Sequence, residues 1–539
     1  MSSNIVSIEQ EDVVQHRGIQ YATLPDAFSE PRILPYEPGS HIKATEFGPS
    51  AVSLPNACAM EQSLIQHPLP HEAFEESGTD CLNLNLSVPV KADGSLPVFV
   101  FFHGGGFMMG SNAWPQYDLA RLVRQAVRLN KPVVGVGVNY RLGPAGFLTS
   151  EELRRAGYKA NNGLRDQRTA LQWIQEYIHH FGGDPTRVTV VGESAGGVSC
   201  FLHLQSHKPL FSQLASMSGN PLTMKPVPLP VAEASYASVI KGLGLEDKPT
   251  AERVRALLET PLQKLAGLGA SLPLIPTVDG EIISSGMEFG RLDEALSATW
   301  PGAEWCGNLL IGDCQFDGSI MAFPLLPRKA EIAQKLQEAA ERVLSEHHDR
   351  RSVANHILAS YQIDTAAAAA TSDGDATLTK VLRFATDILF YASTLEIARA
   401  WARAQSRVRS SHKAFVYHFN VPNPWDGPYR GEATHILDVA LLFRNYDEHL
   451  PDGHRHAAEI FANHFIAFVS GEEPYGVFDV ATGGAMVYGP GPQGRVQHAK
   501  FVTGRSSEAY GRRGTVFDLA NKVGLDALSR VWDEVMMMA

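Results

Sequence analysis

The chain has 539 residues, of which 44% are hydrophobic and 19% charged, and this composition is typical of a globular protein rather than of a disordered chain or a coiled coil. The formal charge of −12, with no concentrated run of lysine and arginine, argues against nucleic acid as a partner. The sequence contains no apolar run of the about 20 residues that a membrane span requires, and its N-terminus lacks the pattern of a secretion signal. We therefore expect a cytoplasmic protein without a membrane span, unless a leader for secretion has been removed.

Short apolar runs alternate with amphipathic stretches over the first 320 residues. The runs at 97–102, 132–138, 187–191 and 308–311 are continuous in apolar residues, as in strands that are covered on both faces of a mainly parallel sheet. Between two of them, residues 163–181 carry apolar side chains at helical spacing, and the Gly-Gly-Asp-Pro that follows ends a helix. This order predicts one large α/β domain over residues 1–539.

The region from about 325 to 405 has a different composition. Residues 330–346 and 377–404 are rich in strong helix formers and contain no glycine. The low-complexity stretch at 365–375 is typical of a surface loop between them. We predict a helical insertion packed on the sheet, because no linker supports an independent second domain.

The strongest chemical signal is the sequence VTVVGESAGG at residues 188–197. In it, a run of β-branched residues leads directly into the pattern Gly-x-Ser-x-Gly. Such a run predicts a sharp strand-to-helix turn that holds Ser194 in a strained backbone conformation. The amides at the start of the following helix favour developing negative charge nearby. We interpret Ser194 as a nucleophile, although the bare pattern also occurs in solvated loops.

A second signal is His103-Gly-Gly-Gly-Phe107, at the end of the apolar run 97–102. Three glycines in a row leave backbone N–H groups unshielded, as an oxyanion hole requires. A phosphate-binding loop would end in Gly-Lys-Ser/Thr, and this one does not. A flexible glycine loop is the simpler alternative. We interpret His103 as a structural residue. Where a Gly-x-Ser-x-Gly turn carries the nucleophile, the acid and then the catalytic histidine follow the serine along the chain, and His103 precedes Ser194.

These motifs, with several others, resemble the type-B carboxylesterase family of the α/β-hydrolase fold, which includes cholinesterases and bile-salt lipases. The resemblance covers nearly the whole chain, in the family's order: GIQYA at 18–22, DCLNLN at 80–85, NYRLGPAGF at 139–147, GLRDQR at 163–168, ALQW at 170–173, FGGDP at 181–185 and GESAGG at 192–197.

The resemblance implies which acid completes the site. The family places it in a segment that ends acid-Gly-Ser, and Asp317-Gly-Ser319 fits this pattern. Most relatives have Glu there, so the reach of the side chain is one methylene shorter in this chain. Asp313 is the rival, although it lies four residues too early, and a surface turn residue is its simpler interpretation.

The family's base lies in a His-x-x-acid pattern with an aromatic residue further on, and His435-Ile-Leu-Asp438 with Phe443 matches it. The chain has 20 histidines, so His435 is distinguished only by this pattern; His449 and two others nearby, His454 and His456, are the alternatives. We expect Asp438 to support the site rather than to take part in the chemistry.

The resemblance thus implies a serine carboxylesterase with the triad Ser194, Asp317 and His435. Its oxyanion hole would be formed by Gly105, Gly106 and Ala195, and no metal or cofactor is needed. An acyltransferase or lactonase would use the same residues. Some relatives are non-catalytic binding proteins, but those lose the nucleophile.

Other residues bear on the substrate. Phe107, Met108, Met109 and Trp114 follow the glycine loop and either line an acyl pocket for a small hydrophobic ester or belong to the core. Cys58 and Cys81 occupy positions that many secreted relatives join by a disulfide, and a cytoplasmic chain would leave them reduced. Cholinesterases place a tryptophan within that loop for cation–π binding of choline, and this chain has none there, so we expect poor turnover of choline esters. The oligomeric state is not predicted.

Overall fold

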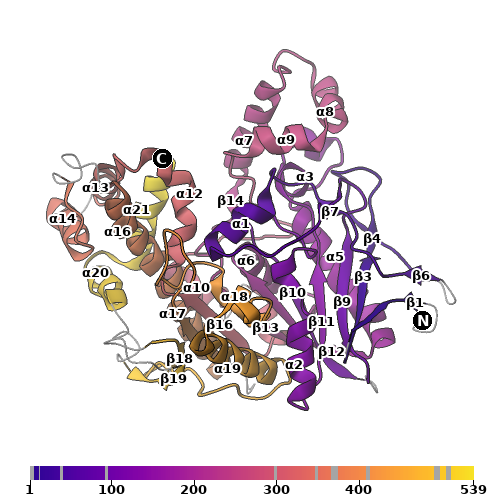
Figure 1. Cartoon of the computed structure of the whole chain (residues 1–539). Helices are drawn as coiled ribbons and strands as arrows, with labels where there is room; N and C mark the ends of the chain where they lie inside the picture. The colour runs from indigo at the N-terminus through magenta and orange to yellow at the C-terminus, as the bar shows by residue number, and fades with distance from the viewer. Residues whose placement is uncertain are drawn as a thin grey trace.

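The computed structural model describes residues 5–10, 12–36, 41–91, 95–296, 300–345, 350–365, 374–407, 413–490, 498–504 and 512–538. Within these ranges, a large twisted sheet crosses the molecule and helices cover both of its faces (Figure 1). No helix in the described part of the chain has the length and apolar character that crossing a membrane would require.

The described sheet has eleven strands in the order β19-β18-β17-β16-β13-β12-β10-β11-β9-β3-β2. Neighbours from β18 to β11 are parallel, and the pairs at the two edges are antiparallel. The bounds are β2 Ile8–Gln10, β3 Val13–Gln20, β9 Asn83–Pro89, β10 Leu96–Phe102, β11 Val134–Val138, β12 Gly183–Glu193, β13 Gln213–Met217, β16 Leu309–Cys314, β17 Ala414–Phe419, β18 Ala485–Tyr488 and β19 Ala499–Val502.

The central strands are apolar throughout because helices pack on both faces. Every residue of β10 is buried. Successive side chains of a strand point to opposite faces, so Val98 and Val100 pack with α5 (Asn162–Tyr177) and α6 (Ala195–Leu202), while Phe99 packs with α2 (Ala120–Arg128) and α19 (Asp452–Val469). The prediction of a mainly parallel, doubly covered sheet is confirmed.

Two groups of helices extend beyond the sheet. One comprises α7 (Leu229–Gly242), α8 (Thr250–Glu259) and α9 (Leu262–Gly269), and the sequence patterns did not reveal it as a separate projection. The other comprises α12 (Ala322–Leu325), α13 (Ile332–Val343), α14 (Arg350–Ser360), α16 (Gly374–Ala385), the π-helical turn Thr386–Ala392, and α17 (Ser393–Arg407), together with α20 (Thr515–Val523) and α21 (Leu525–Met538). The helices of this group from α12 to α17 span the region of about 325–405 that was predicted to be helical, and two C-terminal helices pack with them. Most of the low-complexity stretch, at 366–373, lies outside the described residues.

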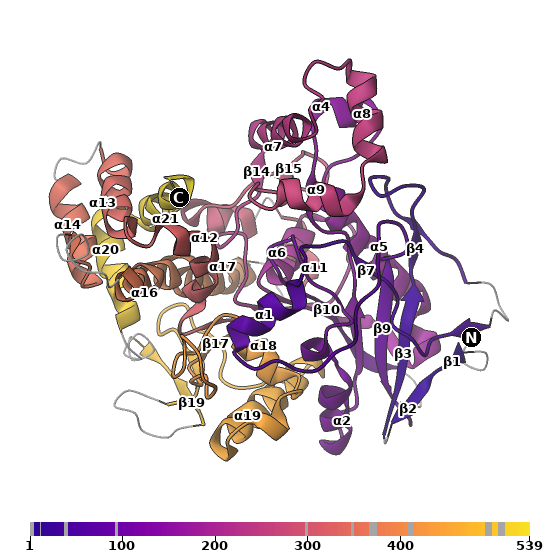
Figure 2. The ribbon, with the colours of Figure 1, turned by 45° about the horizontal axis from the view of Figure 1, so that its top comes forward.

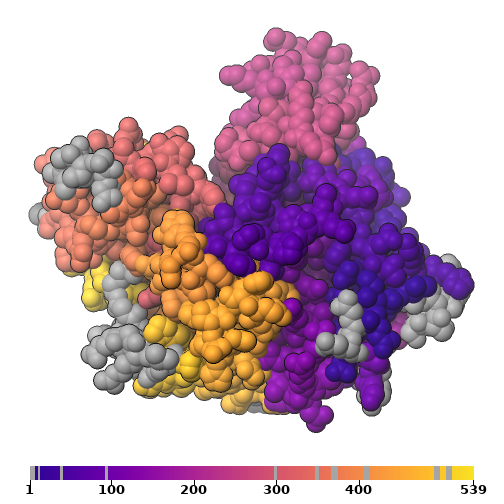
Figure 3. All heavy atoms as spheres, in the orientation of Figure 1, coloured from indigo at the N-terminus to yellow at the C-terminus, as the bar shows by residue number. Residues whose placement is uncertain are grey.

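A notch separates the two groups on one face of the molecule (Figure 3). In this orientation the short helix α1 (Ala57–Ile65) lies below the notch, and Figure 2 shows it in front of the central sheet. Helix α1 begins the segment 57–81, which contains both Cys58 and Cys81; both thiols are buried and free.

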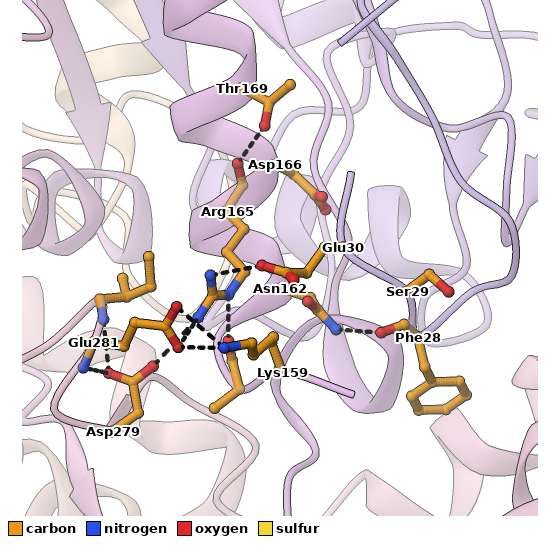
Figure 4. Close-up of polar contacts among 12 residues, drawn as sticks. Phe28, Ser29, Glu30, Lys159, Asn162, Arg165, Asp166, Thr169, Asp279 and Glu281 are labelled. Atoms are coloured by element: carbon orange, nitrogen blue, oxygen red, sulfur yellow. Dashed lines mark hydrogen bonds and ion pairs between the residues drawn. The ribbon is translucent and has the colours of Figure 1, made fainter. Parts of the chain in front are cut away.

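Ion pairs, one of them fully buried, fix the N-terminal end of α5. Asp166 is fully buried and accepts two side-chain hydrogen bonds from Arg141, at 2.7 and 2.8 Å. One residue away, Arg165 points to the other side and contacts Glu30 at 2.9 Å and Glu281 at 3.0 Å (Figure 4). These contacts tie α5 to loops from both the N-terminal region and the α7–α9 region.

Candidate active site

Ser194 lies at the sharp turn between β12 and α6. Its backbone has φ 53° and ψ −122°, a conformation that L-residues rarely adopt. The Ser194 N–H donates a hydrogen bond to the Met217 carbonyl on the neighbouring strand, at 2.8 Å. A Cβ at Gly192 would overlap the Gly196 carbonyl across the turn, so a glycine is required there. Ser194 is the only residue from Val190 to Leu202 that keeps partial solvent exposure.

The glycine loop after β10 packs directly on this turn. A Cβ at Gly104 would lie 3.0 Å from the Ser194 Cβ and would overlap the Glu193 carboxylate. Gly105 and Gly106 both have positive φ, at 94° and 63°, and the Cα of Gly106 faces open space. Ala195 opens α6 on the other side of Ser194. Of the residues predicted to form an oxyanion hole, Ala195 directly follows Ser194, and Gly105 and Gly106 continue the loop from Gly104, which packs on the serine.

His103 braces the glycine loop. Its ring stacks on Tyr140 with centroids 4.5 Å apart, and the Tyr140 hydroxyl donates to the His103 carbonyl at 2.7 Å. The His103 Nδ1 lies 3.0 Å from the Gly104 carbonyl oxygen. Burial lowers the pKa of His103 to about 4, so the ring is neutral at physiological pH. This environment suits the structural role expected of it.

Asp317 and His435 are brought together from distant parts of the chain. The Asp317 Oδ1 lies 2.8 Å from the His435 Nδ1, and both side chains are buried. The other oxygen of Asp317 accepts hydrogen bonds from the Cys314 N–H at 2.7 Å and the Ser218 hydroxyl at 3.1 Å. Burial raises the pKa of Asp317, while its hydrogen bond with His435 favours the ionised form. The shorter side chain of aspartate thus reaches the imidazole.

The segment around His435 is also fixed. The His435 N–H donates to the Ser319 hydroxyl oxygen at 3.1 Å, and the Phe390 ring packs edge-on against the imidazole at 5.4 Å. On the other side, Thr434 Oγ1 donates to the Leu64 carbonyl at 3.2 Å. The segment 57–81 therefore supports the histidine from the N-terminal part of the chain.

Asp313, the rival acid, has different partners. It lies in β16, fully buried, 2.8 Å from the His418 Nδ1 and paired with Arg513. Burial opposes ionisation of Asp313, but the charges of His418 and Arg513 hold its pKa below the usual value. The simpler interpretation of Asp313 as a surface turn residue was wrong, because the strand continues through it.

The outer nitrogen of His435 faces the turn that carries the serine. Its Nε2 lies 3.2 Å from Glu193 Oε1, and in the structure it forms no hydrogen bond with Ser194. Glu193 is fully buried, and neither of its carboxyl oxygens has a hydrogen-bond donor. Burial raises the pKa of Glu193 well above its ordinary value, and the charge of Glu61 is the next cause. No role for Glu193 was predicted from the sequence; its position next to Ser194 was the available signal.

Asp438 supports the same region. The Tyr417 hydroxyl donates to one of its carboxyl oxygens at 2.7 Å, and the Val439 N–H donates to the other at 2.8 Å. Burial, together with the charge of Asp317, raises the pKa of Asp438 to about 6. The three alternative histidines have separate environments: His449 packs on His67, His454 bonds to the Pro422 carbonyl, and His456 lies near Glu459.

The residues considered for an acyl pocket are mostly enclosed. Phe107 is fully buried against Phe147, and Met109 and Trp114 are also buried, whereas Met108 is partly exposed. In the described ranges, no cluster of three or more histidine, cysteine, aspartate or glutamate side chains is arranged to hold a metal ion.

The chain is similar to a known protein family and to several of its members. Residues 3–485 match the model of the carboxylesterase family. The chain is 28% identical to lipase 3 of Yarrowia lipolytica over 87% of both chains, and 30% identical to the para-nitrobenzyl esterase of Bacillus subtilis over 74% of this chain and 73% of that protein. It is 32% identical to lipase 4 of Diutina rugosa, but this match spans only 54% of that protein.

Solved structures show the same fold. A para-nitrobenzyl esterase superposes with a TM-score of 0.69 over 94% of this chain and 97% of its own, and a thermophilic para-nitrobenzyl esterase with 0.72 over 94% and 98%, at 22% and 23% identity. The fold is that of the α/β-hydrolases. The chain belongs to the carboxylesterase family, and the relatives named above are carboxylic ester hydrolases.

Proposed function

We propose that this chain hydrolyses carboxylic esters through an acyl-enzyme on Ser194. The observation that carries the proposal is the convergence of three parts at one turn: the strained Ser194, the glycine loop against it, and His435, whose Nε2 reaches the adjacent Glu193 at 3.2 Å. Side chains held in rare backbone conformations and bordered by a buried acid–imidazole pair are typical of nucleophilic sites.

The steps follow from these positions. His435 takes the proton from Ser194 as the serine oxygen attacks the ester carbonyl, and Asp317 stabilises the imidazolium through the 2.8 Å contact. The amides of Gly105, Gly106 and Ala195 stabilise the tetrahedral oxyanion. His435 returns the proton to the leaving alcohol, and water then attacks the acyl-enzyme with the same histidine as base. This mechanism requires the Ser194 hydroxyl to rotate to within hydrogen-bonding distance of the His435 Nε2.

The test is labelling with a fluorophosphonate probe, followed by mapping of the modified peptide. We expect the adduct on Ser194, and no labelling of the Ser194→Ala or His435→Ala variants. His456→Ala, an exposed histidine, is the matched control and should label normally. Ser194→Ala should lower kcat on the order of 10⁶-fold, as in other serine hydrolases. Labelling at another residue would disprove the assignment.

The substrate is proposed to be a small hydrophobic ester, and para-nitrobenzyl esters are suitable first probes because a relative is named for them. The segment 57–81 has no tryptophan, so choline esters should be turned over poorly compared with aryl esters. Acyl transfer to an alcohol, or lactone opening, would use the same residues, and product analysis in the presence of a competing alcohol distinguishes these reactions from hydrolysis. The free thiols of Cys58 and Cys81 suit the predicted cytoplasmic location, which cell fractionation would test.

A further inference from the structure

Glu61 is a buried acid without a cationic partner, close to the site. It lies on α1, and only 2% of its surface is exposed. The Gln116 amide donates to its Oε1 at 2.9 Å, and the Tyr117 hydroxyl also favours its ionised form. Among the described residues it forms no ion pair. A buried carboxylate in such surroundings is costly for stability, so its retention calls for a functional explanation.

The position of Glu61 connects it to His435 in two ways. Its charge is the largest electrostatic influence on Glu193, whose Oε1 lies 3.2 Å from His435 Nε2. Its own helix is fastened to the histidine segment by the hydrogen bond from Thr434 to the Leu64 carbonyl and by one at 2.9 Å from Asn423 to the Ile65 carbonyl. Glu61 and His435 therefore keep a fixed separation.

We propose that Glu61 is a positioning residue for His435: from the segment 57–81, its ionised carboxylate stabilises the imidazolium that forms during catalysis. The inference rests on the proposed function, since His435 must be the base for this charge to matter. Glu61 does not contact the serine and takes part in no bond-making step.

The titration of Glu61 agrees with this role. Burial raises its pKa to about 7, while Tyr117, Gln116 and the charge of His435 oppose the rise. Five titratable groups surround Glu61. Glu193 ends β12, Tyr117 follows the glycine loop, and Cys58 lies on the same helix as Glu61. The other two, His435 and Tyr446, flank α18 (Leu437–Leu442). Burial is the largest cause of the raised pKa of Glu193.

The test is the pH dependence of kcat/KM for Glu61→Gln, which keeps the shape and the hydrogen bond from Gln116. Without the negative charge the imidazolium is less stable, so the acid limb should move to lower pH. The shift should be less than about one pH unit, because Glu61, with a pKa of about 7, is only partly ionised on that limb. Glu61→Asp, which keeps the charge, should restore most of the wild-type profile. A purely structural role would change the plateau or the thermal stability, but not the position of this limb.

The controls separate the possible failures. Glu72→Gln removes an exposed carboxylate from the same segment and should leave the profile unchanged. If Glu61→Gln does not fold, Tyr117→Phe gives a second route: it removes a hydroxyl that favours ionised Glu61, so the limb should shift in the same direction by a smaller amount. Profiles that superimpose on the wild type would overturn the inference while fluorophosphonate labelling of Ser194 still supported the proposed function. Absence of labelling in the wild type would instead refute the function itself.

Discussion

Asp166 and Glu193 are equally hidden from water, but their surroundings are opposite. Both oxygens of Asp166 accept hydrogen bonds from Arg141, and this pair fixes the start of α5. Neither oxygen of Glu193 has a donor, and the nearest basic atom is the imidazole Nε2 of His435. A buried charge that serves the fold is neutralised by its partner, whereas an uncompensated acid beside an imidazole can alter the reactivity of that imidazole.

Among the buried acids, the largest effect on kcat is expected for Asp317, which contacts His435. Asp317→Asn should lower kcat about 10⁴-fold, because an amide can present its N–H to the Nδ1 of His435 and favour the wrong tautomer, as in serine proteases. The free energy of unfolding should change much less, since the asparagine can still accept the hydrogen bond from the Cys314 N–H. Steady-state kinetics with an aryl ester, together with urea unfolding, measure both quantities. A loss of stability that accounts for the lost activity would contradict the prediction.

The second largest effect, on the free energy of unfolding, is expected for Asp166, which is paired with Arg141. Asp166→Asn leaves the Arg141 guanidinium buried without its counter-charge, and this should cost about 3–5 kcal/mol in the free energy of unfolding. The folded fraction should retain its kcat, because neither residue adjoins Ser194. Urea unfolding followed by fluorescence, with active-site titration of the folded fraction, provides the measurement. An unchanged midpoint would show that the pair is dispensable.

Asp438 offers a pH-dependent test of an acid near the site. Burial and Asp317 raise its pKa from 3.8 to about 6, so the folded state holds this proton more tightly than the unfolded chain. The stability that this proton contributes is complete below about pH 4 and is lost as the pH rises through 6. Asp438→Asn should therefore raise the free energy of unfolding at pH 8 on the order of 3 kcal/mol, with no gain at pH 4. An equal gain at both pH values would contradict the prediction.

The smallest effect is expected in the exposed part of the Arg165 cluster. Glu281 contacts both Arg165 and Lys159, but its side chain is 51% exposed (Figure 4). Glu281→Gln should change the free energy of unfolding by less than about 1 kcal/mol, because solvent and salt screen such pairs. Unfolding at low and high salt measures the difference, with Asp166→Asn as the buried counterpart. A loss as large as that of Asp166→Asn would show that exposure does not determine the strength of these pairs.

The sequence predicted the sheet well because strands that are buried on both faces consist of short, nearly continuous apolar runs. The run at 97–102 is apolar at every position and that at 308–311 at all but Asn308, and they correspond to β10 and β16, in which every residue is buried. The projection of α7–α9 was not predicted, because its amphipathic helices resemble those that cover the sheet. The Gly-x-Ser-x-Gly turn placed Ser194 correctly between strand and helix, since a local backbone requirement is written in adjacent residues.

Contacts across long sequence separations could not be predicted in the same way. Glu61 stands in a polar stretch, Glu61-Gln-Ser63, that is typical of an exposed helix, and only the packing of α1 against Gln116 buries it. Asp313 and Asp317 have similar local surroundings, but Arg513, about 200 residues later, pairs with one and His435 contacts the other. The assignment of Asp317 depended on the family resemblance, and the structure provides the physical reason for it.

The hydrogen bond between Thr434 and Leu64 spans 370 residues, and this separation has a consequence for synthesis of the protein on the ribosome. At translation rates of about 5–20 residues per second, residue 435 is made tens of seconds after residue 194. During that interval the turn that carries Ser194 can form, but His435 and the support that it requires on both sides are missing. The nascent chain should therefore be inert toward esters and toward fluorophosphonates. Reactivity should arise only when β17 and the segment that follows it pack against helix α1, which is already folded.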